Sequence, residues 1–122
     1  TNFIDASVVN QDKVFCKDIQ LECNTTGIAE ERSVKIAIRP ESILLSQNKS
    51  NEQNCIQGTI KENEFLGSFQ RLYVESPSLS EELLMIDIAN TSQTNFDLNQ
   101  GSMIYFIFPP DQIKVYPNSW IF

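Results

Sequence analysis

The side chains that could carry acid–base chemistry in this sequence are the adjacent carboxylates Glu30-Glu31 and Glu81-Glu82. Two carboxylates can hydrolyse a glycosidic bond when they face each other across it. Adjacent residues of a loop point apart, however, so we interpret both pairs as solvated surface groups. The sequence contains no His, and it therefore lacks the commonest general base and the commonest metal ligand. We expect no catalytic site in this chain.

Sequence motifs for phosphate binding and nucleophilic catalysis are also absent. There is neither a G-x-x-x-x-G-K-[ST] loop nor a G-x-G-x-x-G loop for nucleotide phosphates, and no G-x-S-x-G elbow for a catalytic serine. The three cysteines, Cys16, Cys23 and Cys55, are odd in number and match no zinc-ligand spacing. Free thiols are typical of a reducing compartment, so we expect a cytosolic protein without a metal site.

A competing signal for localisation comes from three Asn-x-Ser/Thr triplets, which begin at Asn24, Asn48 and Asn90. This pattern is the acceptor for N-glycosylation and would place the protein outside the cell. The sequence is rich in Asn, Ser and Thr throughout, so chance matches in loops are expected. The cytosol is favoured, and secretion stays the alternative.

The remaining candidate residues are suited to contacts rather than to catalysis. The corner Arg39-Pro40-Glu41 is either structural or offers its guanidinium to a neighbouring domain or an anion. Gly67-Ser68 either forms a bend or lets the backbone of a partner approach closely. Trp120 in the tail either folds back on the domain or marks a contact surface.

Charge and hydropathy restrict the possible partners. The chain has 9 basic and 16 acidic residues, which gives a net charge of −7. This negative field repels phosphate backbones, so nucleic acid is not an expected partner. No apolar run reaches the roughly 18 to 20 residues that cross a bilayer, and we expect membrane association only through a partner. The sequence begins at Thr1, so we expect a fragment or a processed chain.

Alternating apolar and polar residues predict a series of short strands. The segment 34–38 alternates, and Pro40, which cannot donate to a strand ladder, ends that strand. The segment 79–88 is ambiguous, because Ser78 and Glu81 could cap a helix whereas its alternating apolar residues favour a strand. The predicted strands are 3–9, 13–16, 18–23, 34–38, 42–45, 55–62, 69–75, 84–88, 103–108 and 113–116.

Roughly ten short strands without a long helix are typical of a small β-barrel or sandwich. The chain has 122 residues, of which 41% are hydrophobic, and this predicts one compact all-β domain. The polar loop 46–54 divides it into two β-rich halves, about 1–46 and 55–116, and a tail follows at 117–122. We expect that loop to lie on the surface and to be mobile.

Three segments of the sequence match a family pattern. They are Ala37-Ile38-Arg39-Pro40-Glu41-Ser42-Ile43, then Ile56-x-Gly58-x-Ile60-x-Glu62, and then Phe65-Leu66-Gly67-Ser68. In this order and spacing they resemble the TOBE domain, which is the C-terminal regulatory part of ATP-binding subunits of ABC-type importers. The resemblance covers Asn2 to about Tyr116.

The resemblance implies an OB-like β-barrel, built by strands from both halves, that hydrolyses nothing. ATP and Mg would be bound only by an ATPase domain upstream, and no cofactor is expected in this fragment. The implied partners are a second copy of the ATP-binding subunit, its own upstream ATPase domain, membrane permease subunits and a small-molecule or protein regulator. The implied location is the cytoplasm, peripheral to the inner membrane. The motifs do not choose among sugars, polyamines, iron, sulfate and phosphonates as the transported solute.

Two alternatives to a regulatory and dimerisation domain stay open. One is a free-standing OB-like module that binds a small anion or metabolite. The other is an OB-fold reader of single-stranded nucleic acid, which the net charge opposes. The residues that we predict at a regulatory or interface site are Arg39, Glu41, Gly67, Ser68, Arg71 and Trp120.

Overall fold

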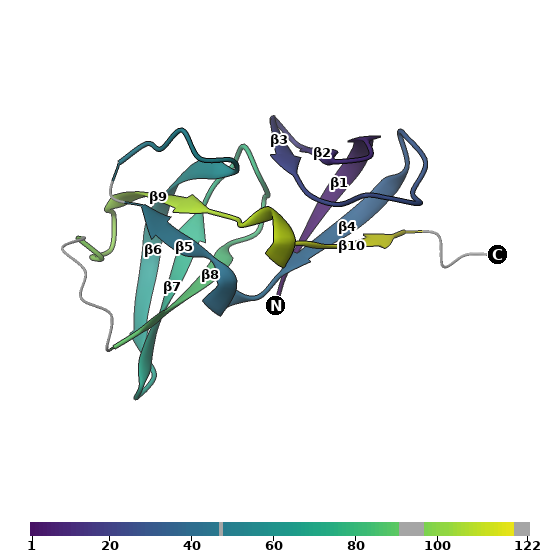
Figure 1. The fold of residues 1–122 in the computed structure, drawn as a ribbon. Coiled ribbons are helices and arrows are strands. Elements are labelled where there is room, and N and C mark those ends of the chain that lie inside the picture. The colour runs from purple at the N-terminus through teal and green to yellow at the C-terminus, as the bar shows by residue number, and fades with distance from the viewer. Residues whose placement is uncertain (47, 91–96, 119–122) are drawn as a thin grey trace.

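The computed structural model describes residues 1–46, 48–90 and 97–118, and over these residues the chain forms ten strands and two short 3-10 helices (Figure 1). The strands are β1 (Asn2–Asn10), β2 (Lys13–Cys16), β3 (Ile19–Glu22), β4 (Ser33–Ile38), β5 (Leu44–Ser46), β6 (Cys55–Phe65), β7 (Phe69–Glu75), β8 (Leu84–Ala89), β9 (Met103–Ile107) and β10 (Lys114–Pro117). The 3-10 helices are η1 (Pro40–Ser42) and η2 (Pro110–Gln112).

The ten predicted strands are confirmed, and their limits differ from the predicted ones by at most three residues. The ambiguous segment 79–88 contains the strand β8, and the residues before it form a turn that buries Leu79 completely. The strand β6 continues past the predicted limit at 62 to Phe65, because the hairpin bend begins only at Leu66. The strand predicted at 42–45 starts later, at Leu44, because Ser42 still belongs to the 3-10 turn.

The strands pair into two antiparallel sheets of five strands each, and the sheets exchange strands. The first sheet has the order β10-β4-β1-β2-β3 and the second has the order β5-β9-β6-β7-β8. Each sheet therefore takes one edge strand from the other half of the chain, as Figure 1 shows at β5 and β10. The barrel that the family resemblance implies, with strands from both halves, is built in this way.

Both exchanges occur at matching proline corners. Pro40 and Pro110 each occupy the first turn of a 3-10 helix, where a residue without a free N–H fits well. The residue that follows each corner, Ile43 or Ile113, is buried. The hydroxyl of Ser42 lies 3.3 Å from Oε1 of Gln112, so equivalent positions of the two corners are in contact. The chain thus turns in the same way at both corners.

The first strands of the two halves repeat the same pattern. Asn2-Phe3-Ile4 opens β1, and 52 residues later Asn54 directly precedes Cys55-Ile56, which open β6. Two residues after the isoleucine both strands have a small residue, Ala6 or Gly58. The strand orders of the two sheets correspond position by position, with β1 matching β6 and β4 matching β9. Our sequence analysis predicted two halves but no such repeat.

One hydrophobic cluster contains buried side chains from both sheets. Its largest completely buried side chains include Phe106 and Phe108, whose rings lie 5.7 Å apart between centroids. Cys16 on β2 and Cys23, which directly follows β3, are buried free thiols, and burial raises the pKa of Cys16 to about 12 and that of Cys23 to about 11. Both thiols therefore stay protonated at neutral pH.

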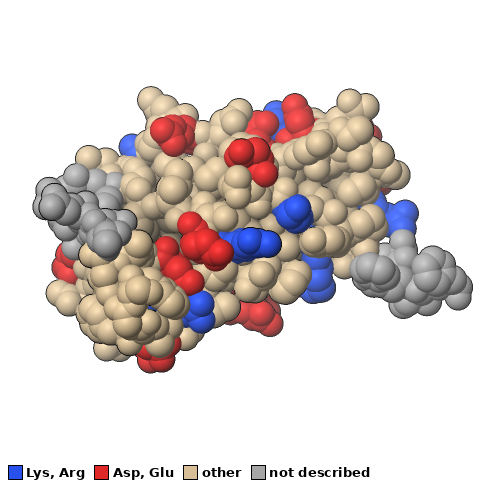
Figure 2. Space-filling model, turned by 60° about the horizontal axis from the view of Figure 1, so that its bottom comes forward, with Lys and Arg blue, Asp and Glu red and all other residues tan. Residues whose placement is uncertain are grey.

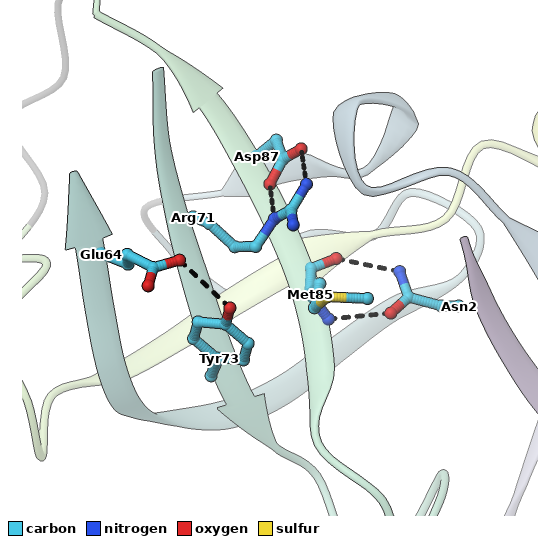
Figure 3. A network of polar contacts seen from close by, with 6 residues as sticks. All are labelled: Asn2, Glu64, Arg71, Tyr73, Met85 and Asp87. Atoms are coloured by element: carbon cyan, nitrogen blue, oxygen red, sulfur yellow. Dashed lines mark hydrogen bonds and ion pairs between the residues drawn. The ribbon is translucent and has the colours of Figure 1, made fainter. Parts of the chain in front are cut away.

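Asn2 attaches the first sheet to an edge of the second. Its amide nitrogen donates to the carbonyl of Met85 at 2.9 Å, and its amide oxygen accepts from the N–H of Met85 at 2.8 Å (Figure 3). Met85 lies on β8, the edge strand of the second sheet. The side-chain amide therefore takes the place of a strand partner at one residue of an open edge, and Asn2 itself is only 5% exposed.

Asn54 makes the equivalent attachment in the opposite direction. Its amide oxygen accepts from the N–H of Glu22 at 2.7 Å, and its amide nitrogen donates to the carbonyls of Glu22 at 2.9 Å and Phe108 at 2.8 Å. Glu22 lies on β3, an edge strand of the first sheet. Asn54 ends the polar loop that we predicted to be a mobile surface segment, but it is partly buried and holds the two sheets together.

We predict that Gly58→Ala destabilises the fold by about 1–3 kcal/mol, because the added methyl group overpacks the core. A Cβ at Gly58 would lie 2.5 Å from Cγ1 of Val74, 3.0 Å from Cε1 of Phe106 and 3.1 Å from the carbonyl oxygen of Glu75. Urea unfolding of Gly58→Ala, Val74→Ala and the double variant forms a double-mutant cycle. The double variant should lose at least about 0.5 kcal/mol less free energy of unfolding than the two single variants lose together. Additive losses would contradict this packing argument.

We predict that Asn54→Gly lowers the free energy of unfolding by about 1–3 kcal/mol. The N–H and carbonyl of Glu22 and the carbonyl of Phe108 would each lose a hydrogen-bond partner. Asn54 has a φ of 62°, which glycine adopts without strain, so this variant removes the amide alone. Glu31→Gly is the matched control, because Glu31 has a φ of 63° and makes no such bridge. Urea unfolding should show no loss for the control. Equal stability of the two variants would contradict the structural role of the amide.

Candidate functional site

An open groove lies where the two proline corners meet the outer face of the first sheet. Arg39, Glu41 and Ser42 line it from the first corner, Asp111 and Gln112 line it from the second, and Lys114 lines it from the start of β10. The rest of its lining comes from strands of the first sheet and includes Phe3, Lys35 and Tyr116. The groove thus contains residues that are far apart in the sequence and that only the strand exchange brings together.

The register of the first sheet fixes which side chains border the groove. Phe3 on β1 is opposite Ala37 on β4, which is opposite Lys114 on β10. Two residues further along, Asp5, Lys35 and Tyr116 form the next row across the same strands. Since alternate residues of a strand point to the same side, both rows lie on one face.

That face carries both aromatic and charged side chains. The exposed fraction is 55% for Phe3 and 42% for Tyr116, so neither ring is in the core. Nζ of Lys35 lies 2.8 Å from Oδ1 of Asp5, and this hydrogen bond raises the pKa of Lys35. Figure 2 shows that basic side chains gather near the middle of one face of the molecule, with acidic side chains close beside them.

Of the predicted interface residues, Arg39 and Glu41 lie in this groove. The backbone explains their position, because Arg39 is extended and precedes the 3-10 turn that starts at Pro40. The carbonyl of Arg39 accepts from the N–H of Ser42 at 3.0 Å, and this closes the turn. Both charged side chains of the corner are exposed.

Arg71 lies elsewhere, on the second sheet, and has an internal partner. Its Nε and Nη2 donate to the two carboxylate oxygens of Asp87 on the neighbouring strand at 2.8 and 3.0 Å (Figure 3). This bidentate bond raises the pKa of Arg71, and the guanidinium carbon lies 5.6 Å from the centroid of the Phe69 ring. Its predicted role at an interface stays a prediction, and the structure gives it a role within the sheet.

A second polar contact joins β6 and β7 beside this ion pair. The hydroxyl of Tyr73 lies 3.3 Å from Oε1 of Glu64 (Figure 3). Partial burial, the charge of Glu64 and this hydrogen bond all raise the pKa of Tyr73. These contacts run across strands of one sheet.

Gly67 and Ser68 form the tip of the hairpin between β6 and β7. Gly67 has a φ of 83°, which favours glycine, and the N–H of Leu66 donates to the carbonyl of Phe69 at 2.9 Å. No heavy atom lies within 4 Å of a Cβ built at Gly67, so the position is open. The turn geometry therefore explains why this residue is glycine. Trp120, the last predicted site residue, lies outside the described residues.

Sequence reasoning missed the second half of the groove. The predicted interface residues include neither Asp111 nor Lys114. Comparison of 38–45 with 108–115 would have revealed them. In both segments a proline is followed by an acidic residue, a polar residue and a buried isoleucine.

The structure supplies no candidate for acid–base or metal chemistry in the part of the chain that it describes. Both predicted carboxylate pairs are exposed at all four positions, as expected for solvated groups. Over the described ranges no group of three or more His, Cys, Asp and Glu side chains could hold a metal ion. A search of those residues also finds no helix that could cross a membrane. What the groove offers is a surface of exposed charges and aromatic rings.

Most of the chain is similar to an importer ATP-binding protein and to a molybdate-binding protein. Fe(3+) ions import ATP-binding protein FbpC 2 of Rhizobium meliloti (strain 1021) is 24% identical over 126 residues, which cover 95% of this chain and 32% of that protein. This chain therefore spans about a third of the length of that relative. The solved structure of the cytoplasmic molybdate-binding protein ModG, with molybdate bound, has a TM-score of 0.79 at 11% sequence identity and covers 95% of both chains.

At that identity the likeness to ModG shows the fold alone, and it confirms the predicted all-β, OB-like fold. The family comes from a separate match. The model of the TOBE domain matches residues 36–115, which include the end of β4, both proline corners and the whole second sheet. This range contains the three motifs on which the resemblance was based. The chain belongs to the TOBE domain family.

Proposed function

We propose that this chain is the non-catalytic regulatory and dimerisation domain of the ATP-binding subunit of an ABC-type solute importer. The observation that carries the proposal is the match of 95% of this chain to about a third of an iron-importer ATP-binding protein, together with membership of the TOBE family. A domain of this kind acts through contacts, and exposed charges and rings in the groove are suited to that task.

The proposal assigns the remaining functions to other parts of the importer. ATP and Mg bind to a separate ATPase domain upstream, and the permease subunits hold the assembly at the inner membrane from the cytoplasmic side. The partners of this domain are its counterpart in a second ATP-binding subunit, its own ATPase domain and a regulatory protein or solute. The proposal leaves the solute open, because the named relative imports Fe(3+) ions but only 24% of the residues are identical.

A second candidate function is a module that binds a small anion directly. The fold shared with a molybdate-binding protein favours it, as do the exposed cations Arg39 and Lys114 in the groove. Such a module would be stabilised by its ligand, by roughly 2.7 kcal/mol at about 100 times Kd. Thermal unfolding with molybdate, sulfate and phosphate separates the two functions. A flat response supports the regulatory domain, and a saturable increase in Tm with one anion supports the module.

We predict that the reading frame upstream of Thr1 encodes a P-loop of the form G-x-x-x-x-G-K-[ST]. Sequencing the native gene tests this directly. In the full subunit, removal of residues 2–118 should then weaken nucleotide-free dimerisation, because a contact surface is lost. Sedimentation of the two proteins measures that difference. A start codon immediately before Thr1, or an unchanged dimer after the removal, would contradict the proposed function.

A further inference from the structure

The groove at the proline corners has a small residue in its floor. This residue is Ala37 on β4, which is paired with Phe3 of β1 on one side and with Lys114 of β10 on the other. Neighbouring strands lie about 4.8 Å apart, so the side chains of Phe3 and Lys114 stand on the two sides of a short methyl group. The groove has a volume of about 1010 Å³, whereas small-molecule sites have roughly 300 to 1,000 Å³. A small organic molecule therefore fits into it.

Three basic side chains lie next to Ala37, although the chain as a whole carries a net charge of −7. Lys35 and Arg39 are two residues away from it in the two directions along the chain, and Lys114 is its partner on β10. All three are exposed and line the groove. Lys35 is paired with Asp5, whereas Arg39 and Lys114 take part in none of the salt bridges among the described residues. These two cations are suited to bind an anion beside the floor of the groove.

Two exposed aromatic rings stand on opposite sides of this floor. Phe3 is beside Ala37 on β1, and Tyr116 is one row further along, on the other side of β4. Both rings line the groove, whereas Phe15, an exposed ring on the same sheet face, does not. Aromatic side chains stack on nucleobases with little regard to sequence, because every base has a π-face. The groove thus offers stacking rings and free cations within one small site.

Acidic side chains border the site and restrict what can enter it. Glu41 and Asp111 line the groove at the two corners, and Asp5 lies in the row next to Phe3. A polynucleotide would have to bring further phosphates past these carboxylates, and the net charge of −7 repels its backbone. A single nucleotide has one phosphate group to place. The acidic border therefore favours a free nucleotide over a nucleic acid strand.

We propose that a nucleoside monophosphate binds in this groove, with its base stacked between Phe3 and Tyr116 over Ala37 and its phosphate bound by Arg39 and Lys114. The base covers two rings that otherwise face water, and the phosphate supplies the opposite charge that the two cations lack. This inference goes beyond the proposed function and beyond the candidate anion module, because neither of them has a ligand with an aromatic ring.

Isothermal titration calorimetry of the whole chain with AMP, CMP, GMP and UMP tests the site. At least one nucleotide should bind saturably, with one site per chain. Its nucleoside and inorganic phosphate, titrated separately, should each bind at least about tenfold more weakly, because each makes only half of the contacts. Tyr116→Ser removes a stacking ring, and Arg39→Gln or Lys114→Gln removes a phosphate contact, so each variant should weaken nucleotide binding at least about tenfold. Circular dichroism checks that the variants are folded.

The matched controls are Phe15→Ser, at an exposed ring of the same sheet face, and Lys49→Gln, at an exposed cation; both residues lie outside the groove. Both variants should bind the nucleotide like the original chain. The inference is overturned if none of the four nucleotides binds at millimolar concentration, if phosphate binds as tightly as every nucleotide, or if the controls lose as much affinity as the groove variants. Tighter binding of a single-stranded oligonucleotide than of any mononucleotide also overturns it. The proposed function is tested separately, by the reading frame upstream of Thr1.

Discussion

The fold depends on two side-chain amides that act as strand partners. A sheet edge that is partly covered leaves peptide groups that water cannot reach freely, and such groups need a hydrogen-bond partner. Asn2 supplies one to β8, and Asn54 supplies one to β3. Each amide belongs to one sheet and binds the edge of the other. The two sheets therefore share one core in a fixed relative position.

This fixed position creates the groove. Pro40 and Pro110 turn the chain from one sheet to the other, and the two turns meet at Ser42 and Gln112. Because the corners are short 3-10 turns, the acidic residue at the second position of each is held outward while the following isoleucine is buried. The same local geometry thus packs the core and exposes the charges. No mobile element is required for the groove to exist.

Much of the fold follows from short-range patterns. Alternation of apolar residues predicted most of the strands, since one face of most strands is buried, and Pro40 marked the first corner correctly. Pairing of β10 with β4 could not be predicted in this way, because it depends on which open edge remains after the other strands have paired. The role of Asn54 was missed for a similar reason. Its partners are 32 and 54 residues away in the sequence, and a polar residue at the end of a polar loop has no distinctive local pattern.

Only part of the candidate site was predicted, because short-range patterns do not show which distant segments meet in the fold. Arg39 and Glu41 belong to a conspicuous local motif, whereas Asp111 and Lys114 become relevant only when the fold brings the second corner beside the first. Arg71 is the opposite case, a predicted interface residue whose side chain has a partner within the domain. In the sequence the guanidinium of Arg71 looks free to bind a partner. In the fold, Asp87 on the neighbouring strand already binds it.

The strand exchange also determines the order of events when the chain is made on a ribosome. β4 emerges early, but its outer partner β10 is separated from it by five other strands. Until β10 has left the ribosome, the first sheet has an open edge at β4, and the core beneath it is incomplete. Sheets whose pairing spans most of the chain fold slowly, and open edges of nascent sheets are where aggregation starts. The domain therefore reaches its folded state only after nearly all of its residues have been synthesised, and the elongating chain needs protection until then.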